Sequence, residues 1–412
     1  MRDKADMSFV AAPFKEHAEA KLECRFTPHG VLPIMAVYGA NASGKSNALR
    51  ALHYIRHFVI TSFRTAEQAG TGRKAFRLDA GSEEENSLFE IDFVIDDVRF
   101  ELGFELDDKK VVREWLNQYP NKIRQKLYER SEQFFEYGRA LTGPNKQIES
   151  VTLPNVLFLS AAAASKHPIL EKISEFFKEK LFFRFSNGVS PAEFDEIGES
   201  LFRNEDLKND VVRLLRFADT GIRDLKITEE EIPADAKSGI ASLVELIQKL
   251  AGPAFPPELK FSKTHTYKIS VGHECGDDKV RHLSLATESL GTQYLLQLLP
   301  SLLVALNLGA VIILDEITTA LHTLLARKIV SMFNNKALNK HGAQLIFTTH
   351  DTNLLYPGLL RRDEIWFAEK SSEGATVIYP LSDIKTKNSD NIEKGYVEGR
   401  FGAIPFVSEF SL

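Results

Sequence analysis

Cysteine is scarce in this chain, with only Cys24 and Cys275 among 412 residues. Two cysteines cannot build the multi-bridge framework of a small secreted domain, and neither belongs to a CxxC pair of the kind that holds zinc. Residues 1–13 lack the basic-then-apolar pattern of a secretion signal, and no apolar run is long enough to cross a bilayer. These absences predict a cytoplasmic protein that does not depend on disulfides.

An excess of positive charge is missing as well. Lys and Arg number 51 against 57 Asp and Glu, and the net charge of −6 argues against a surface devoted to nucleic acid, although it allows a local basic groove. Hydrophobic residues make up 43% and charged residues 26%, which is the balance of a globular chain. The length allows one large α/β domain with an insertion or two ordinary domains.

A complete phosphate-loop pattern, GxxxxGK[ST], occupies residues 39–46. It lies between a short apolar run at 32–38, predicted as a strand, and a predicted helix at 46–59, and this context disfavours a chance glycine turn. In such a loop, backbone N–H groups surround the β-phosphate, the lysine neutralises the β and γ oxygens, and the hydroxyl binds Mg²⁺. The predicted nucleotide-binding residues of this loop are Gly39, Ala40, Asn41, Ala42, Ser43, Gly44, Lys45, Ser46 and Asn47.

An acidic pair, Asp315-Glu316, follows the apolar run Val311–Leu314 in the form of a Walker B strand. Asp315 is predicted to hold Mg²⁺ through water, with Ser46 as the other metal ligand. Glu316 is predicted to orient or deprotonate the attacking water. A helix N-cap with an acidic first turn is the alternative, which the phosphate loop elsewhere in the chain disfavours.

His350 ends the next predicted strand, at residues 344–348, in the sequence TTHD. A histidine at this place can donate a hydrogen bond to the γ-phosphate and so distinguish ATP from ADP. A lone histidine at a strand end is more often a surface residue. Its position one helix, predicted at 321–333, after the acidic pair favours the catalytic role.

A short polar segment, residues 289–292 (SLGT), precedes a predicted apolar helix at 293–308. Ser289, Gly291 and Thr292 at a helix start form a second surface suited to anions, here a γ-phosphate. An ordinary helix cap has the same residues. The position just before the Walker B strand favours nucleotide contact.

These motifs predict an α/β fold: a P-loop nucleotide-binding domain with a mixed or parallel sheet, an antiparallel β lobe and an inserted helical region. Residues 88–94 and 98–106 are the predicted lobe strands, separated by a turn at Asp96-Asp97. The predicted division is 1–108 for the N-terminal half of the head, 109–257 for a mainly helical insertion and 258–412 for the C-terminal half. Pro253, Pro256 and Pro257 mark a predicted loop before that last part.

In chain order, the four motifs resemble the head domain of ABC-type (AAA-like) ATPases, with SLGT as a degenerate LSGGQ signature. The resemblance implies ATP and Mg²⁺ as cofactors, slow switch-like hydrolysis, and a homodimer in which the signature of one copy closes over ATP held by the other. The resemblance leaves open whether oligomers larger than a dimer form.

More closely, the chain resembles ATPases of prokaryotic abortive-infection and restriction-linked anti-phage islands, the group that includes the ATPase subunit of the PARIS system. The matching stretches are YGANASGKSN at 38–47, ESLGTQ at 288–293, LDEITTALH at 314–322, FTTHDTNLL at 347–355, DEIWFAE at 363–369 and GYVEGRFGAIP at 395–405. The resemblance implies a sensor or regulator that controls a separately encoded effector, expected to be a TOPRIM, HNH or other nuclease. A phage protein or DNA would be the trigger, and no membrane partner is implied.

The chain departs from the ABC pattern in places. Gln68 is a weak candidate for the Q-loop glutamine because no strand precedes it, and His322 is predicted either to contact the second subunit or to begin a helix. A RecF- or Rad50-like DNA-clamping repair ATPase is the alternative function. The missing zinc hook, the short insertion and the acidic net charge disfavour this DNA-clamping function. A transporter's nucleotide-binding subunit is the least favoured of the three functions.

Overall fold

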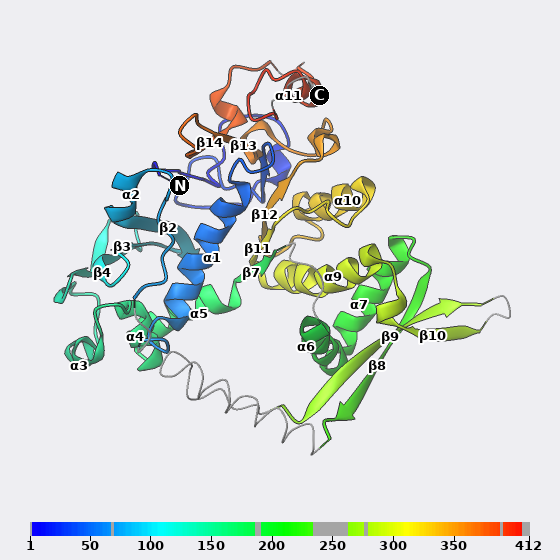
Figure 1. Cartoon of the computed structure of the whole chain (residues 1–412), viewed down its shortest axis with the longest axis horizontal. Coiled ribbons are helices and arrows are strands. Elements are labelled where there is room, and N and C mark those ends of the chain that lie inside the picture. The colour runs from blue at the N-terminus through cyan, green and yellow to red at the C-terminus, as the bar shows by residue number, and fades with distance from the viewer. Residues whose placement is uncertain are drawn as a thin grey trace. The chain divides into compact units, whose positions relative to one another are not determined.

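The computed structural model describes residues 2–66, 70–185, 191–233, 263–275, 279–387 and 390–405. It is a mixed α/β protein, with one mixed sheet and two antiparallel sheets accompanied by helices (Figure 1). The chain forms two compact units, Met1–Leu181 with Arg361–Leu412 and Phe182–Leu360. Within the described residues, no helix has both the length and the apolar character needed to cross a membrane.

The first unit is built around a buried strand, β1 (Ile34–Tyr38), in which every residue is inaccessible to solvent. It pairs in parallel with β13 (Ile365–Lys370), and β13 pairs antiparallel with β14 (Thr376–Pro380). Helix α1 (Lys45–Thr61) begins after the loop that follows β1 (Figure 1). The predicted strand–loop–helix order is therefore confirmed, and the phosphate loop lies at the carboxyl end of a buried strand.

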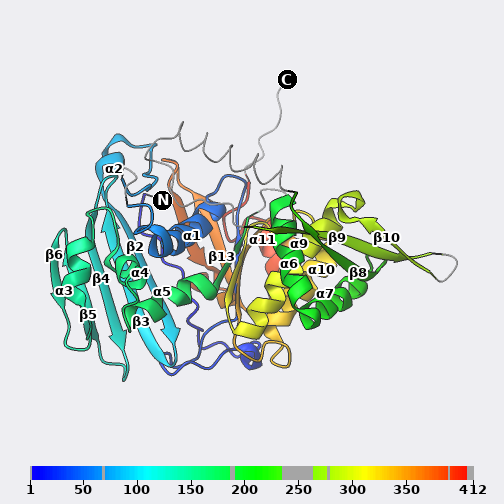
Figure 2. The same ribbon diagram turned by 90° about the horizontal axis from the view of Figure 1, so that it is seen from below.

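A five-stranded antiparallel sheet forms the β lobe of the first unit. Its strands follow chain order and lie side by side in Figure 2. They are β2 (Ser87–Ile95), β3 (Val98–Leu106), β4 (Val111–Tyr119), β5 (Gln125–Ser131) and β6 (Phe134–Tyr137). Asp96 and Asp97 have φ values of 45° and 57°, the backbone of a type I′ hairpin turn, so the predicted β2–β3 hairpin is confirmed.

The predicted boundary at residue 108 is not a domain boundary in this lobe. It falls between β3 and β4, which pair along nearly their whole length. The mainly helical insertion expected from residue 109 is therefore wrong for β4, β5 and β6.

Buried polar residues join the lobe to a helix. The Glu114 carboxylate of β4 accepts hydrogen bonds from the backbone N–H groups of Phe158 and Leu159, at 2.8 and 3.1 Å, where α4 (Phe158–Ala164) begins. It also accepts one from the Tyr128 hydroxyl at 2.7 Å and lies 3.6 Å from the Arg130 guanidinium. Because Glu114 satisfies amide groups at a helix start, its charge is stabilised despite full burial.

The remaining helices of the first unit are short. They are α2 (Ala80–Glu84), α3 (Asn145–Val151), α5 (Leu170–Glu179) and α11 (Ile392–Val397). Tyr396 of α11 stacks on Phe367 of β13, with ring centroids 5.4 Å apart, and its hydroxyl donates to Ala403 O at 3.1 Å. The C-terminal stretch of the defence-ATPase resemblance is thus a packing element of the sheet.

The second unit contains two parallel strands, β11 (Val311–Leu314) and β12 (Gln344–Thr349), paired so that Leu314 faces Phe347. The next strand in this part of the sheet is β7 (Leu181–Arg184). Helices α9 (Leu290–Leu308) and α10 (Thr323–Asn334) precede and follow β11. Both predicted strands, their parallel pairing and the helix between them are confirmed.

A three-stranded antiparallel sheet, in the order β10-β9-β8, completes the second unit. It comprises β8 (Ile222–Glu231), β9 (His265–Glu274) and β10 (Val280–Ser284). The helices α6 (Pro191–Arg203) and α7 (Glu205–Phe217) pack on β9 and β8. The expected helical region is correct for α6 and α7 and wrong for β8. The proline loop predicted before residue 258 lies outside the described residues.

Candidate nucleotide-binding site

The phosphate loop of the first unit has room only for glycine at two positions. A Cβ on Gly39 would lie 2.3 Å from Ala368 O of β13, and one on Gly44 would lie 2.0 Å from Thr376 Oγ1 of β14. Gly44 also has φ 102°, a value that L side chains rarely adopt. Thr376 Oγ1 donates to Ser43 O at 2.9 Å, so β14 holds the loop from one side. The sequence pattern is therefore a real constraint of the fold.

Lys45 is the first residue of α1 and is 6% exposed. Its Nζ donates to Gly39 O at 2.8 Å and to Ala40 O at 3.0 Å, which keeps the ammonium group inside the loop. A lysine charge at the N-terminus of a 17-residue helix, beside amide groups, is an environment that favours phosphate. Ser46, the next residue of α1, is partly buried.

In the second unit, Thr348 connects the two members of the acidic pair. Its Oγ1 donates to Asp315 Oδ1 at 2.7 Å and accepts from the backbone N–H of Glu316 at 2.7 Å. Thr348 is fully buried at the end of β12, next to the end of β11. These bonds fix the orientation of the Asp315 carboxylate, and no motif pointed to the role of this threonine.

Glu316 and His350 lie side by side. Nε2 of His350 is 3.4 Å from Oε2 of Glu316, and both side chains are partly exposed. Glu316 has φ 59°, in the left-handed region that residues other than glycine uncommonly occupy. Two residues predicted from separate motifs, a base and a phosphate sensor, are thus brought together by the parallel pairing of β11 and β12.

Arg184 and Tyr294 are neighbours of the acidic pair that sequence reasoning missed. The backbone carbonyl oxygen of Arg184, on β7, accepts from the Asp315 backbone N–H at 2.9 Å, and the Arg184 side chain donates through Nη2 to Ser301 Oγ of α9 at 2.6 Å. Burial raises the pKa of the Tyr294 hydroxyl to about 12; the Arg184 charge opposes this, and the charges of Asp315 and Glu316 add to it. Tyr294 therefore stays protonated at neutral pH and is a hydrogen-bond donor near the carboxylates.

The predicted signature segment lies at the exposed start of α9. Ser289 is the N-cap: its Oγ accepts from the Thr292 backbone N–H at 3.2 Å and lies 2.9 Å from Thr292 Oγ1. Leu290 is 73% exposed, and a Cβ on Gly291 would lie 2.9 Å from Ala320 O. The helix cap considered as an alternative is present, and the same geometry presents a serine and an apolar side chain to solvent.

Other predicted positions have ordinary surroundings. His322 caps α10, with Nδ1 accepting from the Leu324 backbone N–H at 3.2 Å, as expected for a helix start. Asn41 and Ala42 are exposed, and Asn47 accepts from Arg50 at 3.2 Å. Gln68 lies outside the described residues.

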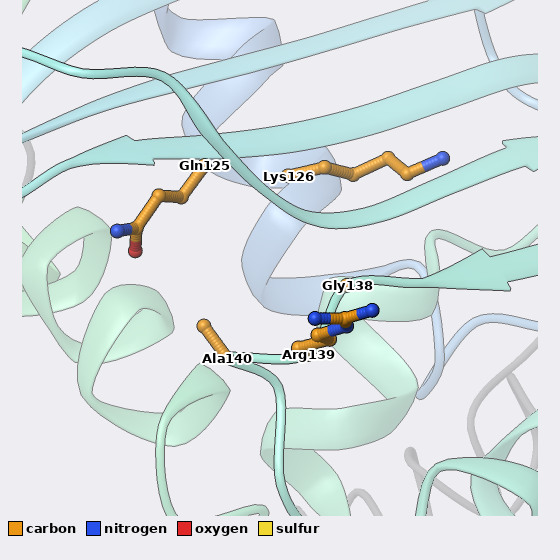
Figure 3. Close-up of a pocket in the computed structure, with 5 residues that line it drawn as sticks. All are labelled: Gln125, Lys126, Gly138, Arg139 and Ala140. Atoms are coloured by element: carbon orange, nitrogen blue, oxygen red, sulfur yellow. The ribbon is translucent and has the colours of Figure 1, made fainter.

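The pocket shown in Figure 3 is separate from these motifs. Its lining residues belong to the β5–β6 edge of the lobe and include none of the predicted site residues: Gln125, Lys126, Gly138, Arg139 and Ala140. Among the described ranges, no group of three or more His, Cys, Asp or Glu side chains is placed to hold a metal. Mg²⁺ bound with a nucleotide needs no such group, because one or two protein ligands suffice beside phosphate and water. The hydroxyl of Ser46 and the carboxylate of Asp315 fit this requirement in kind.

The motifs and their order are those of a P-loop ATPase. The chain belongs to the family described as "AAA domain, putative AbiEii toxin, Type IV TA system", whose model matches residues 34–355. No curated protein matches the chain.

Similar solved structures include an Smc head bound to the C-winged helix domain of ScpA, at 13% identity and TM-score 0.40, covering 84% of this chain and 90% of that chain. Another is the SMC head domain from Thermotoga maritima, at 14% identity and TM-score 0.36, with coverage of 84% and 89%. A third is cbiO1 from Clostridium perfringens, part of the ABC transporter complex cbiONQ, at 14% identity and TM-score 0.28, with coverage of 85% and 78%.

Proposed function

We propose that the chain binds ATP with Mg²⁺ and hydrolyses it slowly, as a switch. The observation that carries this proposal is the phosphate loop, in which neighbouring strands exclude any side chain at Gly39 and Gly44 while the Lys45 ammonium lies inside. Lys45 would neutralise the β and γ phosphate oxygens, and the loop amides would bind the β-phosphate. Ser46 and Asp315 would hold Mg²⁺.

Hydrolysis requires a group that orients or deprotonates the attacking water, and Glu316 has this role in the proposal. Water attacks the γ-phosphorus, the bond from that phosphorus to the β-phosphate oxygen breaks, and ADP and phosphate leave. The 3.4 Å contact between His350 and Glu316 supports a shared task, because a histidine that binds the γ-phosphate there is also in contact with the base.

The active form in the proposal is a homodimer. The exposed Ser289 and Leu290 at the start of α9 support it, because a serine at a helix N-terminus is suited to phosphate and an apolar side chain favours a protein contact. Each copy would supply its signature to the nucleotide of the other.

The biological role we propose is that of a sensor or regulator in anti-phage defence, controlling a separately encoded effector that is expected to be a nuclease. The support is the family's description, which names a putative AbiEii toxin and a type IV toxin–antitoxin system. The likeness to ATPases of defence islands, found through motifs from 38–47 to 395–405, agrees with it.

Expression of this chain alone is expected to leave uninfected bacteria growing normally, since a regulator without its effector has nothing to release. Co-expression with the product of the neighbouring gene should give protection against phage, measured by plaque counts, and the Lys45→Ala chain should remove it. Toxicity of the chain alone would contradict this division of labour. DNA binding that depends on salt and strengthens with ATP, with no phage protection, would instead favour a DNA-clamping ATPase.

The Thr348→Val variant is expected to lower ATP turnover about tenfold, which corresponds to about 1.4 kcal/mol, while ATP affinity changes little. Valine keeps the shape of threonine but cannot donate to Asp315 or accept from the Glu316 amide, so both lose their fixed orientation. The measurement is phosphate release at saturating ATP. Thr266→Val is a matched control, because it removes a 2.8 Å threonine–aspartate bond, to Asp195, away from the nucleotide motifs in the same unit. Equal losses in both variants would contradict a specific role for Thr348.

A further inference from the structure

A histidine on the three-stranded sheet contacts the residue just before the signature serine. Nε2 of His273, on β9, lies 2.8 Å from Oε1 of Glu288, and the two side chains are only 27% and 13% exposed. Glu288 directly precedes Ser289, the N-cap of α9. A partly desolvated hydrogen bond to a carboxylate is among the stronger polar contacts in proteins.

The backbone of Glu288 is held as well. Its carbonyl oxygen accepts from Gln293 Nε2 at 2.9 Å, and its N–H donates to Leu285 O at 3.1 Å. Three bonds therefore converge on one residue. Because a peptide held at its N–H, carbonyl and side chain has little rotational freedom, Glu288 fixes the direction in which the chain enters Ser289.

The other end of this contact lies on a strand that is paired on both sides. β9 is the central strand of its sheet, and His273 faces Ile222 of β8 and Arg281 of β10. The bond from His273 to Glu288 is thus a direct connection from a paired strand to the N-terminus of α9. A shift of this sheet by a bound protein would be passed to the signature through this bond.

We propose that His273 and Glu288 are a positioning pair that holds Ser289 in the orientation needed to contact nucleotide bound by the other copy. This inference rests on the proposed function and adds a residue from outside the sequence motifs. Neither residue touches the nucleotide in the proposal. Their loss should therefore act on dimer formation and turnover and leave the phosphate loop of the first unit unaffected.

The chain supplies a matched control for this pair. His282 of β10 lies 3.0 Å, through Nε2, from Asp224 Oδ2 of β8, so the same kind of histidine–carboxylate bond exists in the same sheet. Neither of these residues contacts the signature segment in the described bonds. The His282→Ala variant therefore shows how much kcat falls when a histidine–carboxylate bond is lost within the sheet but away from the signature segment.

The experiment compares His273→Ala, Glu288→Ala, the double variant and His282→Ala with the wild-type full-length chain. The expected result is a fall in kcat of about tenfold for both single variants and no further fall for the double variant, as for two partners in one bond. Binding of ADP, which requires only the phosphate loop, should change less than about twofold by the same argument of separate sites. His282→Ala should keep the wild-type kcat.

Two further measurements separate positioning from folding. His273→Gln retains an N–H donor of similar reach and should recover most of the kcat. Adding His273→Ala to the Glu316→Gln chain should reduce the ATP-dependent dimer seen by size-exclusion chromatography.

Wild-type kcat in His273→Ala, or an equal fall in His282→Ala, would overturn the inference and leave the proposed function intact. A wild-type chain without ATP turnover or ATP-dependent dimer would overturn both.

Discussion

Replacing Lys45 by alanine is expected to weaken ATP binding at least about a hundredfold, or about 2.7 kcal/mol. The ammonium lies inside the phosphate loop, 2.8 Å from Gly39 O, in the place where the β and γ phosphates would be bound. Hydrogen bonds between charged groups contribute about 1.5–3 kcal/mol each, and the lysine would make more than one of them. Isothermal titration with ATP and Mg²⁺ measures the change directly.

The control for this variant is Arg50→Ala. Arg50 is an exposed cation of the same helix, so its removal lowers the positive charge near the loop by the same amount. It gives up one 3.2 Å hydrogen bond to the exposed Asn47 side chain and leaves the contacts of Lys45 with the loop carbonyls in place. ATP affinity should stay within about twofold of wild type, because screening makes exposed charges weak contributors. An unchanged affinity in Lys45→Ala, with wild-type thermal stability, would show that the loop does not bind the triphosphate.

The parts of the fold that could be predicted are those that a short contiguous segment of the sequence determines. The phosphate loop needs glycine at positions 39 and 44 because Ala368 and Thr376 approach the backbone there, so the pattern records a steric requirement. The β2–β3 hairpin was equally predictable. Asp96 and Asp97 tolerate the positive φ angles of its turn, and the flanking strands carry apolar side chains.

The rest of the lobe was not predictable because several of its buried side chains are polar. Glu114, Tyr128 and Arg130 occupy core positions of β4 and β5 where an apolar residue would have revealed the alternation. Their burial depends on bonds to one another and to the start of α4. β8 ends in three glutamates, which likewise mask the alternation of apolar and polar side chains expected for a strand.

The candidate site likewise has residues that contiguous motifs indicate and residues that only the folded structure reveals. Asp315, Glu316 and His350 were predicted as site residues from strand-end motifs, and the structure places Glu316 and His350 in contact. Thr348 was not found, because its importance comes from the register between β11 and β12. The pairing of His273 with its carboxylate partner depends on the same kind of information, since the residues are joined only when the sheet forms.

Replacing Glu316 by glutamine is expected to lower ATP turnover by about a hundredfold to ten-thousandfold, the usual contribution of a general base. Glutamine has the shape of glutamate but cannot take a proton from water. It also removes a negative charge that, in the proposed mechanism, would face the γ-phosphate, so ATP affinity should be kept or increased. Phosphate release and ATP titration measure the two effects, and the dimer should accumulate with ATP.

Glu199→Gln is the matched control, because Glu199 pairs with Arg203 on α6 and has no role in the motifs. Unchanged turnover in Glu316→Gln would reject Glu316 as the base.

The loop variant Lys45→Ala and the base variant Glu316→Gln together also separate ATP binding from ATP hydrolysis. Lys45→Ala removes both, whereas Glu316→Gln keeps ATP bound. If phage protection fails in the first variant and persists in the second, ATP binding alone controls the effector, and hydrolysis serves only to reset the switch.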